Sequence, residues 1–106
     1  MQFKNLFAYQ KSFELAMNIF EISKSFPVDE RYSLTDQIKR SSRSICSNLA
    51  EANRKKIYPK HFLSKLSDSD AENSETQSWL LFCHSCNYIS AQQFNMLTEN
   101  RWRLEN

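Results

Sequence analysis

The sequence contains no glycine, and this absence excludes several kinds of functional site. Phosphate-binding loops, dinucleotide-binding fingerprints and nucleophile elbows each need a backbone that approaches a ligand closely or takes a positive φ angle, which glycine allows. Tight β-hairpin turns lose their preferred residue as well. Antiparallel helices can be joined through Asn, Ser and Pro, so the composition favours an all-α protein.

Long apolar runs are also lacking. No segment approaches the roughly 18 apolar residues of a membrane span, and the first residues do not resemble a signal peptide. Three cysteines, Cys46, Cys83 and Cys86, are an odd number, which fits a reducing compartment better than a disulfide framework. We therefore expect a soluble, cytoplasmic protein. Its 106 residues make one domain with a limited core, which self-association would help to stabilise.

The apolar residues that are present recur at helical spacing. Two Ser-led segments, Ser33–Asp36 and Ser90–Gln93, resemble capping boxes, and Pro59 suits the first position of a helix. Asn53 is the best available left-handed residue after the second helix. The pattern predicts one helical-bundle domain over residues 1–106, with a short fourth helix and with helices at about 6–26, 34–53, 59–87 and 91–105.

Polar residues interrupt the apolar pattern in the second and third predicted helices. The second helix carries serines where large core residues are usual, which indicates that another helix crosses closely or that subunits assemble there. The third is polar from Asp68 to Gln77. Four residues, Asn48, Glu51, Glu72 and Glu75, are spaced to share faces of these helices. They predict a structural polar network; an exposed acidic stripe or a carboxylate metal site are the alternatives.

The spacing of the His, Glu and Cys residues gives little support for a metal site. A di-metal bundle site needs Glu-x-x-His pairs, and neither His61 nor His84 follows a glutamate by three residues. Cys83 and Cys86 have chelating spacing, but a structural zinc site needs four ligands and His61 is the only other candidate. Cys83 fits a core position better. We expect no cofactor, no metal and no catalytic residues.

Charge is distributed unevenly along the chain. Residues 39–65 carry eight basic residues against Glu51, a net charge of +7, whereas residues 66–100 carry five acidic residues and no basic one. Such a basic segment favours phosphate contacts, although a solvated face that balances the acidic third helix is the alternative. The candidate nucleic-acid-binding residues are Lys39, Arg40, Arg43, Arg54, Lys55, Lys56 and Lys60.

The segment Q-I-K-R-S-S-R-S-I-C-S-N-L-A-E-A-N-R-K, from Gln37 to Lys55, resembles bacterial four-helix-bundle proteins once called S23 ribosomal proteins, which are encoded in intervening sequences of 23S rRNA genes. The segment H-F-L-S-K-L-S-D-S-D-A-E-N-S-E-T-Q-S-W-L is similar to one subgroup of that family. The resemblance covers residues 3 to about 97. Most relatives have E-G-x-G-R where this chain has Glu51–Lys55, so either the second helix runs on or Asn53 makes the turn.

The resemblance implies an antiparallel up-down-up-down bundle that assembles as a homopentamer. It also implies kinship with the accessory variability protein of diversity-generating retroelements, a basic pentamer that binds nucleic acid and partners a reverse transcriptase. We therefore expect a non-enzymatic homo-oligomer, pentameric by this resemblance, that contacts RNA or DNA through the basic residues. The alternative is a scaffold that binds a partner protein, such as a reverse transcriptase, without nucleic acid.

Overall fold

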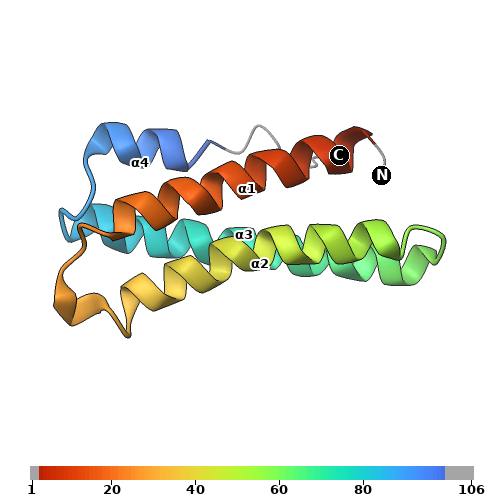
Figure 1. The fold of residues 1–106 in the computed structure, drawn as a ribbon, viewed down its shortest axis with the longest axis horizontal. Helices are drawn as coiled ribbons and strands as arrows, with labels where there is room; N and C mark the ends of the chain where they lie inside the picture. The colour runs from red at the N-terminus through yellow and green to blue at the C-terminus, as the bar shows by residue number, and fades with distance from the viewer. Residues whose placement is uncertain (1–2, 100–106) are drawn as a thin grey trace.

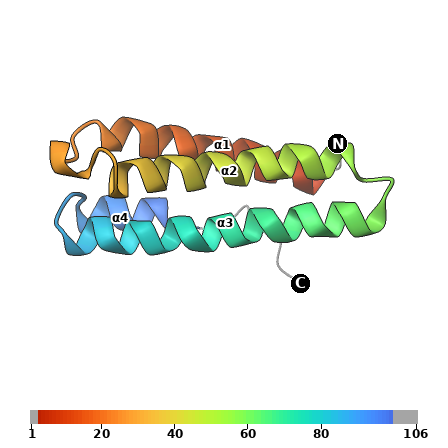
Figure 2. The ribbon, with the colours of Figure 1, turned by 90° about the horizontal axis from the view of Figure 1, so that it is seen from below.

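The computed structural model describes residues 3–99, which form an elongated all-α bundle of 44 × 25 × 19 Å. Its four α-helices are α1 (Phe3–Ser23), α2 (Leu34–Arg54), α3 (Pro59–Ser85) and α4 (Ala91–Leu97), and a short 3-10 turn, η1 (Val28–Glu30), precedes α2. Successive helices run antiparallel, with α2 and α3 side by side along their length (Figures 1 and 2). The predicted all-α, four-helix fold with a short fourth helix is confirmed.

The core is a line of branched aliphatic side chains with small polar residues between them. Ile19, Ile38, Ile45, Leu80 and Leu97 are each at most 2% exposed. No strand occurs among residues 3–99, and none of the helices in that range is long and apolar enough to cross a membrane. Burial of this aliphatic line supplies the main driving force for folding.

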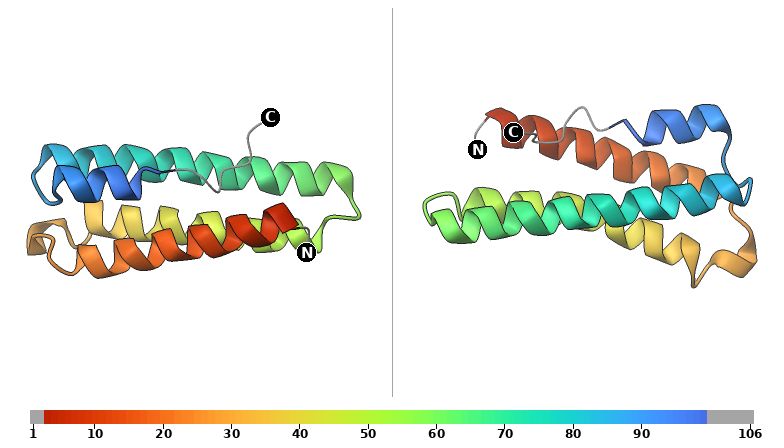
Figure 3. Two further views of the ribbon diagram at one scale, coloured as in Figure 1. Left: turned by 90° about the horizontal axis from the view of Figure 1, so that it is seen from above. Right: turned by 180° about the vertical axis from the view of Figure 1, so that it is seen from behind.

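Three of the four helices end earlier than the sequence predicts. α1 ends at Ser23, ahead of Pro27, and α3 ends at Ser85, two residues early. α4 ends at Leu97 with Thr98 as its cap, short of the expected residue 105. Residues 100–105 of the expected fourth helix lie outside the described residues. Within that description, α4 packs beside only one end of α1 and α3 (Figure 3).

The predicted capping box at Ser33 is wrong, because the Ser33 side chain makes no capping bond to α2. Ser33 Oγ instead donates to Glu30 Oε1 at 2.6 Å, and the same carboxylate oxygen accepts the Leu34 N–H at 3.4 Å. Tyr88 Oη donates to the other oxygen, Glu30 Oε2, at 2.9 Å. These bonds hold the pKa of Glu30 below its usual range. Glu30 therefore caps α2 and ties it to the α3–α4 connection.

The second capping box is confirmed, and so is the role of Pro59. Ser90 Oγ accepts the Gln93 N–H at 3.0 Å, and Gln93 Oε1 accepts the Ser90 N–H at 2.8 Å. Pro59 takes the first position of α3, where its missing N–H costs nothing.

Asn53, however, does not take the left-handed turn: α2 runs through it to Arg54, and Lys55 caps the helix with φ −102°. Asn87, at φ 62°, is the positive-φ residue of the described chain.

Candidate nucleic-acid interface

Four of the candidate basic residues gather where α2 ends and α3 begins. Arg54 is the last residue of α2, and Lys55, Lys56 and Lys60 follow in the connection and in the first turn of α3. All four are exposed, and none forms an ion pair with another residue in the range 3–99. We call this group the end-turn cluster. Because α2 continues through Asn53, the cluster projects along the helix axis at the tip of the bundle.

A hollow of about 210 Å³ adjoins the end-turn cluster. It is lined by Lys55, Lys60, His61, Ser64 and Lys65. Lys65 is committed to carboxylates, since its Nζ lies 2.8 Å from Glu51 Oε2 and 3.8 Å from Asp68 Oδ2. These contacts raise the pKa of Lys65 and lower that of Glu51. Lys55 and Lys60 keep their charges available to an anion from solvent.

Two further candidates, on the other half of α2, meet at the aromatic ring of Phe20 on α1. Lys39 Nζ lies 5.7 Å and Arg43 Cζ 5.8 Å from the centre of the Phe20 ring, and Lys24 Nζ of the α1 end lies 4.7 Å from it. Cations over a ring face are attracted by its quadrupole, which offsets part of their mutual repulsion. We call Phe20, Lys24, Lys39 and Arg43 the Phe20 cluster. Sequence reasoning missed Lys24, although its spacing four residues after Phe20 was visible.

The remaining basic candidate, Arg40, is not among the cations at the Phe20 ring. Its Nη1 lies 3.9 Å from Asp36 Oδ2 on the preceding turn of α2, and the Arg40 side chain is largely exposed. Arg43 and Arg54 stand eleven residues apart, about 16 Å along the helix. The structure thus places six of the seven basic residues in two groups, one on α2 and one at the α2–α3 turn, and leaves Arg40 outside both.

Of the four residues of the predicted polar network, Asn48 and Glu51 contact different partners. Asn48 Nδ2 donates within α2 to the Ser44 carbonyl at 3.0 Å, whereas Glu51 reaches across to Lys65. Glu72 is half-buried, and desolvation followed by repulsion from Glu75 and Asp68 raises its pKa. Glu75 is exposed.

One buried polar contact between helices involves Ser41, among the α2 serines where the sequence predicted a close helix crossing or subunit assembly, and the others come from residues that the sequence reading did not single out. Thr76 Oγ1 donates to Ser41 Oγ at 2.8 Å, and Ser69 Oγ donates to the Ile45 carbonyl at 3.0 Å, both between α2 and α3. Ser12 Oγ and Cys46 Sγ lie 3.2 Å apart between α1 and α2. Spacing could have found the α3 members: Ser69, Asn73, Thr76, Leu80 and Cys83 fall on one helical stripe, and each is buried.

The histidines and cysteines do not converge. His84 stacks on Phe94 at 4.8 Å between ring centres, while His61 lies at the opposite end of α3 against Tyr58. Burial raises the pKa of the Cys83 thiol to about 12 and also raises that of Cys46, so both are poor nucleophiles; Cys86 is exposed. Within residues 3–99, no three His, Cys, Asp or Glu side chains gather as metal ligands would.

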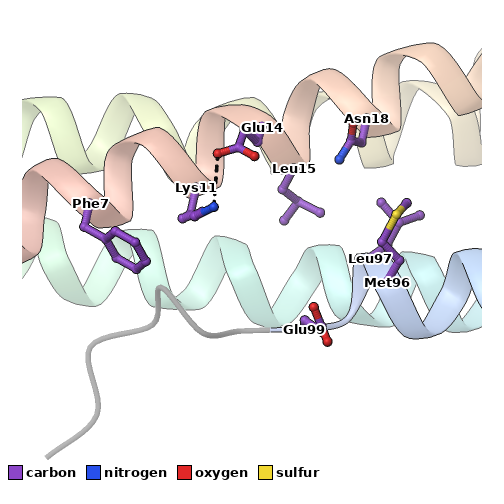
Figure 4. Close-up of a pocket in the computed structure, with 8 residues that line it drawn as sticks. All are labelled: Phe7, Lys11, Glu14, Leu15, Asn18, Met96, Leu97 and Glu99. Carbon is purple, nitrogen blue, oxygen red and sulfur yellow. Dashed lines mark ion pairs between the residues drawn. The ribbon is translucent and has the colours of Figure 1, made fainter.

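A larger hollow, of about 500 Å³, lies between α1 and the end of α4 (Figure 4). Apolar side chains form part of its wall, and Lys11 and Glu14 pair across 3.5 Å at its side. The full lining is Phe7, Lys11, Glu14, Leu15, Asn18, Met96, Leu97 and Glu99. Lys11 and Glu14 neutralise each other, and the rest of the described wall is a mixture of apolar and polar side chains. This lining indicates no particular class of ligand.

Comparison with known proteins assigns the chain to a family. Residues 4–105 match the family described as 23S rRNA-intervening sequence protein. The chain belongs to this family. A crystal structure of a family member, a protein with unknown function from the S23 ribosomal protein family of Bacteroides thetaiotaomicron, is 28% identical, with a TM-score of 0.79 over 89% of this chain and 84% of that one. No curated protein matches the chain. The family resemblance inferred from the sequence is thus confirmed.

Proposed function

We propose that this 23S rRNA-intervening sequence protein is a non-enzymatic, cytoplasmic homo-oligomer that binds RNA or DNA through its basic residues. The observation that carries the proposal is the end-turn cluster, where Arg54, Lys55, Lys56 and Lys60 are exposed and form no ion pair within the described chain. Unpaired cations held close together repel one another, and a polyanion relieves that repulsion while releasing its own counterions.

Lys39, Arg40 and Arg43 extend the proposed contact surface along α2. Most contacts of such side chains go to phosphate oxygens, which fix position and carry little sequence information. Binding is therefore expected to depend weakly on sequence and steeply on salt. Neither a reaction nor a cofactor is part of the proposal.

Binding is tested by filter retention of mixed RNA and DNA at low and at moderate salt. Reversing Arg54, Lys55 and Lys56 to Glu should lower the affinity at least tenfold, because three phosphate contacts are replaced by repulsion. The matched control is Lys11→Glu, a single reversal on α1 away from these residues. Absence of binding by the unaltered protein at low salt, or retention of full affinity by the reversed variant, contradicts the proposal.

Self-association is supported by exposed apolar side chains on α3. Leu63, Leu81 and Phe82 are each more than half exposed, which is costly for a monomer. We propose five subunits, as the family resemblance implies, and a ring would repeat each basic cluster around its circumference. Light scattering coupled to size exclusion measures the subunit count directly, and a monomer at micromolar concentration contradicts this part of the proposal.

A protein-interaction scaffold is the second candidate, and the same α3 residues favour it, since an exposed Leu81–Phe82 pair can also receive a partner protein such as a reverse transcriptase. Co-purification from the native host, with and without nuclease, distinguishes the two functions. A partner that survives nuclease favours the scaffold, whereas one lost with the nucleic acid favours the ribonucleoprotein adaptor.

A further inference from the structure

We infer that the edge formed by α1 and α2 is a binding path for single-stranded nucleic acid, with phosphates on the Phe20 cluster and on Arg54 and with a base stacked on Phe13. The inference rests on the proposed function and narrows its ligand class. It also assigns a role in binding to Phe13 and Lys24, which lie outside the segment that the sequence reading marked as basic.

The first observation is the convergence of three cations, one directly after α1 and two on α2. Lys24, Lys39 and Arg43 all lie within 5.8 Å of the Phe20 ring centre. Lys24 is partly neutralised by Glu21, 3.2 Å from it, but Lys39 and Arg43 form no ion pair with any residue in the described range. The Phe20 cluster thus presents a net positive surface at a fixed place on the edge formed by α1 and α2.

The second observation is an aromatic ring that its neighbours leave open. Phe13 is half exposed, at 50%, and packs on Tyr9 with ring centres 6.4 Å apart and planes tilted by 25°. The contact between Ser12 and Cys46 fixes the register of the antiparallel pair. That register puts Phe13 near the level of Ile45, between Arg43 and Arg54 on α2.

The third observation is continuity along the edge. Lys39, Arg43, Ser47, Ala50 and Arg54 follow each other at intervals of three or four residues, so they form one stripe on the α1 side of α2. The stripe contains no acidic residue. On α1, Phe13 and Phe20 are seven residues apart on one face, about 10 Å. Cations therefore stand at both ends of the path and the open Phe13 ring stands between them.

This order, with cations on both sides of an open aromatic ring, favours single-stranded nucleic acid over a duplex. In a duplex the base faces are stacked on one another inside the helix, whereas a single strand can turn a base outward onto an aromatic ring. Stacking on one side chain is tolerant of base identity because every base has a π-face. Phosphates flanking the stacked base reach the Phe20 cluster on one side and Arg54 on the other.

The test compares two probes, a fluorescent single strand of about 20 nucleotides and the duplex of the same sequence, by fluorescence anisotropy. The expected result for Phe13→Ala is an about tenfold loss for the single strand and little change for the duplex. Phe13→Tyr, which keeps a stacking face, should restore most of the affinity. Met96→Ala is the control, since Met96 is similarly exposed at 51% but lies on α4 and has no ring on which a base could stack.

Charge is tested with the double variant Lys39→Glu, Arg43→Glu, expected to lose at least tenfold in single-strand affinity, and with Lys24→Glu, expected to lose less because Glu21 already neutralises part of that charge. Circular dichroism verifies folding of every variant, and light scattering verifies its subunit count. A change in subunit count for Phe13→Ala would identify the edge as a contact between copies and overturn the inference.

Failure of the inference is separable from failure of the proposed function. If the unaltered protein binds neither probe, both are wrong. If it binds both probes, loses them on reversal of Arg54, Lys55 and Lys56, and is indifferent to Phe13→Ala, nucleic-acid binding stands and the single-strand path is wrong. Equal losses on both probes for Phe13→Ala likewise overturn the path.

Discussion

The two seams of α2 are its interface with α1 and its interface with α3. They are alike in their buried interiors and differ at their solvent-exposed edges. Toward α3 the interior holds Thr76 against Ser41, and toward α1 it holds Ser12 against Cys46. Both seams therefore use small, hydrogen-bonded side chains that let the helices approach closely. At the surface, the α1 edge carries the Phe20 cluster, whereas the α3 edge carries the Glu51–Lys65 pair and Glu72 beside Glu75.

The difference teaches that packing and surface function are set by different residues of the same helix. Inward positions of α2 are small or aliphatic on both sides, so both seams can close. Outward positions decide the sign of charge at each edge. A nucleic acid would be attracted to the α1 edge and repelled from the carboxylates of the α3 edge.

The largest expected effect comes from filling the α3 seam. Ser69 is 3% exposed and donates to the Ile45 carbonyl, so Ser69→Leu forces the helices apart and removes that bond. We expect a loss of about 3 kcal/mol in unfolding free energy. Urea denaturation measures it, with Ser78→Leu on the exposed side of α3 as control. Equal stability of the two variants would show that the seam is loosely packed.

Removing single hydroxyls should show which of the two seams of α2 depends more on its buried polar contact for stability. Thr76→Val keeps shape but leaves the buried Ser41 hydroxyl without its donor, at an expected cost of about 1–2 kcal/mol. Ser12→Ala removes a weaker contact to sulfur and should cost below about 1 kcal/mol. The same denaturation series measures both. The reverse order would mean that the α1 seam depends more on its polar contact than the α3 seam does.

Reversing the charge at the α3 edge should reduce the difference in nucleic-acid attraction between the two edges of α2. The double variant Glu72→Lys, Glu75→Lys gives that edge the sign of the α1 edge, and we expect nucleic-acid affinity to rise about tenfold at low salt. Glu72→Gln, Glu75→Gln should give a smaller gain. Anisotropy titrations at two salt concentrations measure both, and the gain should shrink at the higher one. An unchanged affinity would mean that the α3 edge is covered, for example by another subunit.

The smallest effects are opposite pH responses at the α3 edge. The pKa of Glu72 is raised, so its ionised form destabilises the fold above that pKa, and the cost disappears as the pH falls below the ordinary value of 4.5. The pKa of Glu51 is lowered, so its contribution is present above 4.5 and is lost as the pH falls through the folded value.

Glu72→Gln should therefore raise the melting temperature at pH 7 and Glu51→Gln should lower it, each by roughly 1–3 °C. The Glu72 difference should vanish near pH 3, whereas the Glu51 difference should shrink as the pH falls below 4.5. Thermal melts followed by circular dichroism at the two pH values provide the measurement. Shifts of the same sign at pH 7 would contradict the opposite roles given to these carboxylates.

Helix existence was predictable because it depends on local signals. Pro59 and the box from Ser90 to Gln93 each act within one turn, and both function as their sequence predicts. Ser33 failed as a cap because Glu30, three residues earlier, competes for the same N–H groups and is itself held by Tyr88 from 58 residues away. A contact of that kind is invisible to local pattern.

The candidate site was predictable in its composition and not in its grouping. The basic residues are a property of the sequence between residues 39 and 60. Their division into an end-turn cluster and a Phe20 cluster depends on α2 running through Asn53 and on where α1 crosses it. Lys24 joins the second cluster only because the antiparallel register carries it to the α2 residues Lys39 and Arg43.

By itself, the sequence determined the all-α class, the number of helices and the family, because periodic apolar spacing and the motif around Asn48 and Glu51 are carried by neighbouring residues. The tertiary structure alone decided which polar residues are buried partners and which aromatic ring meets cations. Thr76 and Phe20 occupy ordinary helical positions, and only the packing of a second helix determines whether each is enclosed or left at an edge.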